Sequence, residues 1–180
     1  MSVQDLLASV QASAVADWVR LSNAAPVIEA THVVAAVLLF GTVLVLDLRL
    51  LGLADVSLPF TRISRATLPL VWLAFAVSVA TGSLMFAASA QTYFANTAFR
   101  LKAVALMGAG LNMAFFHLVT ERRMAVWDHG STPCAARAAG LLSMVLWAAI
   151  VLLGRWIGFT KGYDFTIPQG IDLGFPIAPE

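Results

Sequence analysis

The sequence is poor in cysteine and in charge. Its one cysteine, Cys134, excludes an internal disulfide, a cysteine-based zinc cluster and a C-x-x-C-H haem attachment site. Only 12% of the 180 residues are charged, the net charge is +1 and no basic tract is present, so nothing indicates a nucleic-acid partner. The chain also lacks a phosphate-binding loop, an H-E-x-x-H motif, a Rossmann glycine pattern and the M-x-x-M clusters typical of copper(I) sites.

Apolar residues dominate the chain instead. They make up 60% of it, and the mean hydropathy is +0.85, which is typical of an integral membrane protein. Four apolar runs lie near residues 28–52, 66–89, 101–123 and 137–158. Each is long enough to cross a bilayer as a helix, since about 20 helical residues span the hydrocarbon core. We therefore expect an all-α integral membrane four-helix bundle that forms a single domain over residues 1–180.

Two further segments flank these runs. Residues 3–22 repeat apolar side chains at helical spacing and predict an amphipathic helix that lies in the membrane interface. Residues 160–180 are rich in Gly and Pro and predict an irregular tail, either a flap over the bundle end or a disordered segment. The first ten residues contain no basic region, so no cleaved signal peptide is expected.

Four spans place both chain ends on one side of the membrane, which we call the terminal side; the other is the distal side. The distal side holds six basic residues against five on the terminal side, and most acidic residues fall on the terminal side. Because basic residues favour the cytoplasm, we expect a bacterial inner-membrane protein with both termini in the periplasm.

Ionisable residues occur at both ends of the first apolar run. Glu29 and His32 lie near the terminal side, and Asp47 lies about 22 Å further along the helix, on roughly the same face. The third run repeats this arrangement with Lys102 near the terminal side and His117 near the distal side. Ionisable groups within spans usually face the bundle interior, so we expect two polar layers. His32 and His117 then lie too far apart to bind one iron.

The terminal layer predicts a haem b pocket. His32 is the candidate axial ligand, Gly82 would give clearance for the macrocycle, and Glu29 or a carbonyl would orient the imidazole. Lys102 would be the sixth ligand if its amine is neutral, or a propionate partner if it is charged. The alternative is that these residues reach the interface and pair with one another. The candidate cofactor-binding residues are His32, Lys102, Glu29, Gly82, Arg100 and Arg155.

The distal layer has two interpretations. His117 and Glu121, with His129 in the following loop, would either bind a second haem or form a simple polar pair at the membrane rim. A second haem would make a transmembrane electron path.

Structural roles are expected for several other polar and small residues. Asp47 and Arg49 point away from each other on one helix, so each is expected to pair with a group from another helix, for example Asp47 with Arg65 or Arg137, and to fix helix order and register. The alternative is a role in binding a substrate. A separate group is expected to serve close helix packing: Gly108, Gly110 and Asn112.

Several motifs resemble those of one family. P-V-I-E-A-T-H and G-T-V-L-V-L-D-L-R-L-L-G in residues 26–52, T-G-S-L-M-F in 81–86, F-R-L-K in 99–102, N-M-A-F-F-H in 112–117 and G-R-W-I-G in 154–158 are similar to a broad family of small bacterial inner-membrane proteins with four helices. The likeness covers about 150 residues and implies the fold but no activity.

The layout is more distantly similar to the membrane domain of copper-resistance protein D and to HemJ-type protoporphyrinogen oxidases. The HemJ likeness implies a haem b protein in which His32 and Lys102 occupy the essential histidine and lysine positions. This chain departs from the HemJ pattern in its D-L-R-L-L-G segment, its N-terminal helix and its tail, so the oxidase activity is not carried over.

These patterns together predict electron transfer through haem b between a periplasmic redox partner and the quinone pool. The chain is small, which favours a membrane anchor or subunit, as a homo- or hetero-oligomer, over a complete enzyme. The alternatives are a copper-handling protein, a HemJ-like porphyrinogen oxidase and a structural subunit without a cofactor.

Overall fold

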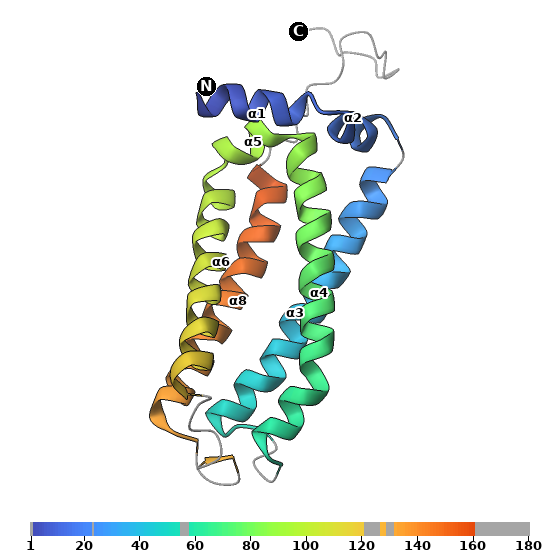
Figure 1. Cartoon of the computed structure of the whole chain (residues 1–180). Helices are drawn as coiled ribbons and strands as arrows, with labels where there is room; N and C mark the ends of the chain where they lie inside the picture. The colour runs from blue at the N-terminus through green and yellow to red at the C-terminus, as the bar shows by residue number, and fades with distance from the viewer. Residues whose placement is uncertain (1, 23, 55–57, 121–126, 129–131, 161–180) are drawn as a thin grey trace, which may run out of the picture.

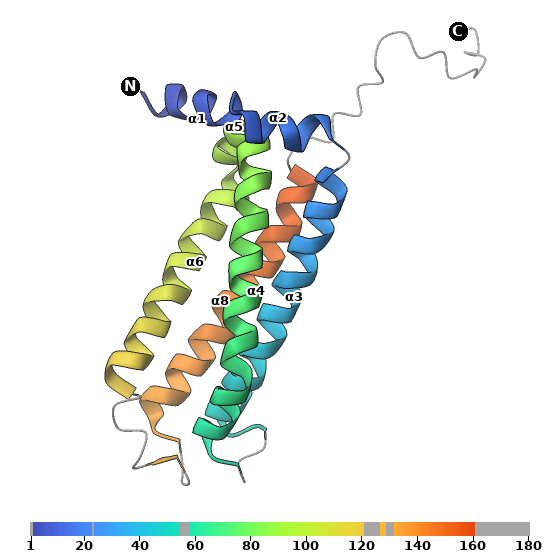
Figure 2. The ribbon, with the colours of Figure 1, turned by 45° about the vertical axis from the view of Figure 1, so that its right-hand side comes forward.

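The chain folds into four long helices that run side by side (Figures 1 and 2). The computed structural model describes residues 2–22, 24–54, 58–120, 127–128 and 132–160. The long helices are α3 (Ala24–Leu51), α4 (Phe60–Ala88), α6 (Thr97–Phe115) and α8 (Cys134–Thr160). Each is long and apolar enough to cross a membrane, α6 together with the start of the π-helical turn η1 (Phe116–Thr120). The expectation of an all-α bundle with four membrane spans is confirmed.

Every long helix begins three to six residues before the apolar run expected from the sequence. A polar cap accounts for this extension in α6, whereas α4 begins after Pro59 without a side-chain cap. At the start of α6, the side chain of Asn96 accepts a hydrogen bond of 3.1 Å from the backbone N–H of Phe99. A helix continues past the apolar run wherever such a cap satisfies its first backbone N–H groups.

The helices pack in an open ring. Helix α3 packs against α4 and α8, and α6 packs against α8, whereas the described parts of α4 and α6 make at most marginal backbone contact. Buried apolar side chains gather at the two ends of the bundle, around Leu50 and Phe60 on the distal side and around Tyr93 and Ile157 on the terminal side. The fourth side of the bundle, between α4 and α6, is therefore the least closed.

Two short helices, α1 (Val3–Gln11) and α2 (Ala14–Leu21), lie across the terminal end (Figure 2). The single amphipathic helix expected over residues 3–22 is therefore broken, because the Ser13 side chain caps a new helix by accepting from the Ala16 N–H. Arg20 ties α2 to the bundle by donating to the carbonyl of Ala88 at 2.9 Å. The short helix α5 (Ala90–Ala95) lies against α1.

The end of α8 reaches the same end of the bundle as α1 and α2 (Figure 1). Asn96 holds it there, since its side-chain amide donates to the hydroxyl of Thr160 at 2.9 Å. The two described ends of the chain thus lie on one side of the bundle, as four spans require. The tail expected at residues 160–180 lies, after Thr160, outside the described residues.

Candidate functional site

His32 is held between α3 and α4 in the terminal layer. Its Nδ1 atom lies 3.0 Å from the hydroxyl of Thr81, and the ring is half-buried. The Thr81 hydroxyl also lies 2.7 Å from the carbonyl of Val77, one turn earlier in its own helix. A hydroxyl has a single proton, so when it donates to Val77 the imidazole must donate to Thr81 through Nδ1–H. That tautomer leaves the lone pair of Nε2 available to a ligand.

Gly82 lets the imidazole approach α4 closely. A Cβ atom at position 82 would lie 3.1 Å from Cε1 of His32, which is tighter than an ordinary van der Waals contact. The clearance over Gly82, expected to admit the haem macrocycle, is therefore occupied by the His32 ring. The glycine therefore positions the histidine against α4.

Lys102 lies beside a second glycine, on α8. A Cβ atom at Gly154 would lie 3.3 Å from the Nζ atom of Lys102. The amine makes no hydrogen bond or ion pair with any described side chain, and its charge acts on the His32 ring. His32, Thr81, Lys102 and Gly154 thus bring α3, α4, α6 and α8 together in one layer, as the sequence predicted for His32 and Lys102.

The remaining candidates of the terminal layer stay on the outer surface. Glu29 is exposed, although its carboxylate acts electrostatically on His32. The groups that orient the imidazole are the Thr81 hydroxyl and the backbone of Ser78, which agrees with the expected carbonyl and not with Glu29. Arg100 is exposed and donates to the hydroxyl of Thr97 at 3.2 Å. Arg155 is also exposed and places its guanidinium 4.6 Å from the ring centroid of Phe159. These three side chains do not converge on His32.

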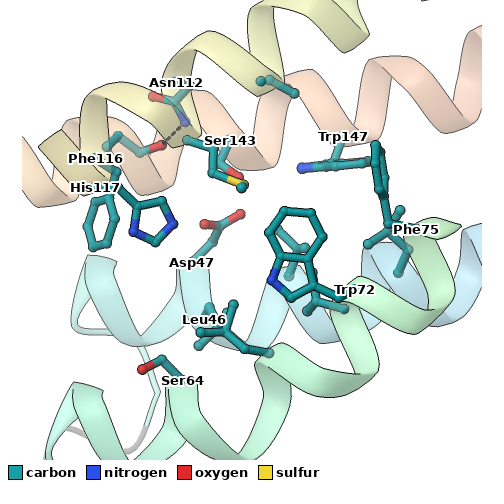
Figure 3. Close-up of a pocket in the computed structure, with 18 of the residues that line it drawn as sticks. Leu46, Asp47, Ser64, Trp72, Phe75, Asn112, Phe116, His117, Ser143 and Trp147 are labelled. Atoms are coloured by element: carbon teal, nitrogen blue, oxygen red, sulfur yellow. Dashed lines mark hydrogen bonds between the residues drawn. The ribbon is translucent and has the colours of Figure 1, made fainter. Parts of the chain in front are cut away.

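The distal half of the bundle contains a cavity of about 380 Å³ between all four long helices (Figure 3). Its walls are mostly aliphatic and aromatic. Asp47, His117, Ser143 and Trp147 place polar atoms in it. The sequence predicted that Asp47 and His117 share a layer, and the cavity brings them together.

Asp47 is the buried acid of this cavity. Only 4% of its surface is exposed, and its Oδ2 atom has no hydrogen-bond partner among the described residues. Its carboxylate points into the cavity toward Ser143, whose hydroxyl interacts with it (Figure 3). The expected ion pair with Arg65 or Arg137 is wrong, because both arginines are exposed and neither reaches Asp47. Helix rotation turns Asp47 toward the cavity and the arginines toward the surface.

Arg49 has the structural role expected for it. It is 1% exposed, and its guanidinium donates to the carbonyl of Leu58 at 3.0 Å and to the hydroxyl of Thr132 at 3.5 Å. Asp128 also stabilises the distal end of the bundle, because it accepts hydrogen bonds from the backbone N–H and the hydroxyl of Thr61 in the first turn of α4. These contacts tie the distal connections to the bundle without using Asp47.

The other distal candidates divide into two groups. His117 lines the cavity, whereas Glu121 and His129, its expected partners, lie outside the described residues. Asn112 links α6 to α8 as expected, since its amide donates to the carbonyl of Ala139 at 2.9 Å. Gly108 lies against Leu146, but Gly110 faces open space in the cavity wall instead of a neighbouring helix.

Sequence reasoning missed the contribution of α8 to the cavity. Ser143 and Trp147 are four residues apart and therefore lie on one face of the helix, which lines the same cavity as Asp47. A serine and a tryptophan at this spacing within an apolar run were the available signal.

No group of three or more His, Cys, Asp or Glu side chains in the described part of the chain is arranged to hold a metal ion. The described residues therefore give no support to a copper site built from such a cluster. A haem requires only one or two axial ligands and is not subject to this requirement.

A comparison with protein families matches residues 7–160 to one described as a family of unknown function, DUF6644. No curated protein matches the chain, and no solved structure matches it. The expected likeness to copper-resistance protein D and to HemJ-type proteins thus stays untested, as does a bacterial origin. Because the match covers both polar layers and all four long helices, the chain belongs to the family of unknown function DUF6644.

Proposed function

We propose that this protein binds haem b in its terminal layer and serves in electron transfer. The observation that supports this most directly is the geometry of His32, whose Nδ1 is occupied by Thr81 and whose Nε2 is left to a ligand. A ligating histidine commonly has its second nitrogen fixed in this way, because the fixed tautomer presents a lone pair to the metal.

One haem would use two donors of this layer. His32 would hold the iron through Nε2, and Lys102 would also hold it when its amine is neutral. The bound haem would supply one-electron chemistry, which no side chain of the layer provides alone. Gly82 and Gly154 would let the two ligands lie close to their neighbouring helices. Arg100 and Arg155 are placed outside this proposed set, because their side chains lie at the surface.

The proposed setting is a bacterial inner membrane with both termini in the periplasm. A haem near the terminal side would then accept electrons from, or donate them to, a periplasmic redox partner, and exchange them with the quinone pool. The small bundle would act as a membrane anchor or subunit of a larger assembly. Four apolar helices support its contact with a lipid bilayer.

Absorption spectroscopy of the full chain, purified in mild detergent, tests haem binding. We expect a Soret band and a reduced α-band in the b-type range, and the loss of both in His32→Ala. Lys102→Met should convert a low-spin spectrum to a high-spin one if the amine is the sixth ligand. A preparation that stays colourless with added haem, or a His32→Ala variant with an unchanged spectrum, would contradict the proposal.

Two threonines give a matched control. Thr81→Val removes the group that fixes the His32 tautomer, so we expect haem affinity to fall about 10-fold or more, as for other second-layer partners of metal ligands. Thr42 bonds only to carbonyls of its own helix, so Thr42→Val should leave the spectrum and affinity unchanged. A colourless protein with stoichiometric copper would instead support metal handling, and a colourless, metal-free protein a structural role.

A further inference from the structure

The distal cavity lies where the bundle is least closed. Its walls include Trp72 and Phe75 of α4 and Leu106 and Met113 of α6, all of them exposed side chains at the mouth between two helices that barely touch. Both helices are membrane spans, so this mouth faces the hydrocarbon phase. A molecule dissolved in the bilayer can enter the cavity without crossing the membrane surface.

Asp47 supplies an unused acceptor inside this cavity. Its Oδ2 atom has no partner among the described residues, and no described residue that lines the cavity is Lys or Arg. A buried carboxylate oxygen without a partner costs free energy, which a ligand with a hydroxyl or carbonyl oxygen would recover. The ionised group accepts from an O–H, and the protonated group donates to a carbonyl.

Trp147 supplies a donor in the same cavity. Its indole nitrogen faces the cavity and has no hydrogen-bond partner among the described residues (Figure 3). A lipophilic cation would satisfy Asp47 but has no acceptor for the indole N–H. A ring that carries oxygen atoms able to donate and to accept satisfies both groups, and the aromatic walls suit a flat ring.

We propose that this cavity binds the head group of a lipid-soluble quinone or its quinol, with Asp47 and Trp147 at the ring oxygens and the tail leaving between α4 and α6. The volume of about 380 Å³ lies in the range of small-molecule sites. This inference rests on the proposed function, because it assigns a binding site to the quinone with which the protein would exchange electrons. Binding itself requires neither His32 nor a haem.

Two glycines allow a steric test with a matched control. A Cβ atom at Gly110 or at Gly41 meets nothing within 4 Å, so the first atom of a larger side chain is not obstructed at either position, but only Gly110 lines the cavity. Decylubiquinone and its quinol are titrated into the full chain in lipid nanodiscs, and quenching of tryptophan fluorescence is followed. We expect saturable quenching, a dissociation constant at least 10-fold higher in Gly110→Leu, and no change in Gly41→Leu. Equal binding by both variants would overturn the proposal.

Three further titrations, two on variants and one with a different ligand, separate the remaining interpretations. Asp47→Asn should weaken quinol binding more than quinone binding, because the amide oxygen is a weaker acceptor than a carboxylate. An equal effect on the two forms, or no effect on either, would overturn the role of Asp47. Tight binding of the lipophilic cation tetraphenylphosphonium at this site, in place of the quinone, would overturn the quinone proposal. His32→Ala should bind the quinone normally, so a failure of the haem proposal leaves this result intact.

Discussion

Single glycines decide where the polar side chains of the bundle lie. Gly82 admits the His32 ring to α4, Gly154 admits the Lys102 amine to α8, and Gly110 opens the wall of the distal cavity. At Gly82 and Gly154 the absence of a side chain leaves room for a neighbouring polar group, and at Gly110 it leaves open space. The backbone is helical at all three positions. Adding even one methyl group at these glycines should therefore disturb the neighbouring polar group or reduce the cavity.

Gly82→Ala should disturb the terminal layer, whereas Gly41→Ala should not. Alanine is favoured over glycine within a helix by about 1 kcal/mol at both positions. At position 82 the new methyl group would press on the His32 ring at 3.1 Å, and such overpacking costs about 1–3 kcal/mol. Reversible unfolding in mixed micelles should therefore find Gly82→Ala the less stable variant, and ring NMR signals of His32 should move in it alone. Equal stability with unchanged signals would show that the contact carries no strain.

At the scale of elements, the terminal end is closed by helices that the membrane spans do not require. Helices α1 and α2 lie across the bundle end, and Arg20 donates to the carbonyls of Gln11 and Ala88. A capping box begins α1, in which the Ser2 N–H donates to Asp5 and the Asp5 N–H donates to the Ser2 hydroxyl. These polar contacts and the burial of Leu7, Ala16 and Val19 together hold the two helices in place.

The capping box makes the start of α1 sensitive to acid. Hydrogen bonds from the backbone N–H and then the hydroxyl of Ser2 hold the pKa of Asp5 below its usual value. The stabilisation is therefore present above the unfolded pKa, about 3.9, and is lost as the pH falls through the lower folded value. NMR shifts of residues 2–8 in micelles should move toward coil values over that range, and Asp5→Asn should resemble the acid form at neutral pH. Shifts that stay constant down to about pH 2 would contradict this linkage.

At the scale of the whole molecule, the open ring of helices separates two polar layers. The terminal layer contains His32 and Lys102, and the distal layer contains the cavity with Asp47 and His117. The apolar length of α3 lies between them. In the proposed function, the terminal layer would serve a water-soluble partner and the distal cavity a lipid-soluble one.

The lone cysteine reports the orientation of the molecule. Cys134 is exposed at the distal start of α8. If the termini are periplasmic, as proposed, a membrane-impermeant maleimide should label Cys134 in intact cells only after permeabilisation. Ala8→Cys in a Cys134→Ser background lies at the opposite end and should be labelled directly. The reverse pattern would invert the topology, and direct labelling of both would contradict a membrane-spanning bundle.

The number of spans and the depth of each polar residue followed from the sequence. A helix rises by the same amount at every residue, so His32 and Asp47 fall in different layers whatever surrounds them. The four apolar runs likewise determined the all-α fold. The broken N-terminal helix was not foreseen, because the cap at Ser13 offsets the cost of interrupting a short amphipathic pattern.

Which side chains meet was decided only by the tertiary structure. Asp47 was expected beside Arg65 or Arg137 and instead faces a cavity, and the space above Gly82 was assigned to a macrocycle and contains an imidazole. Both outcomes depend on how far each helix is rotated and on which pairs pack closely, and a rotation of one residue position turns a side chain by about 100°. Rise along a helix is a local property of the backbone, whereas rotation and pairing are set jointly by all four helices.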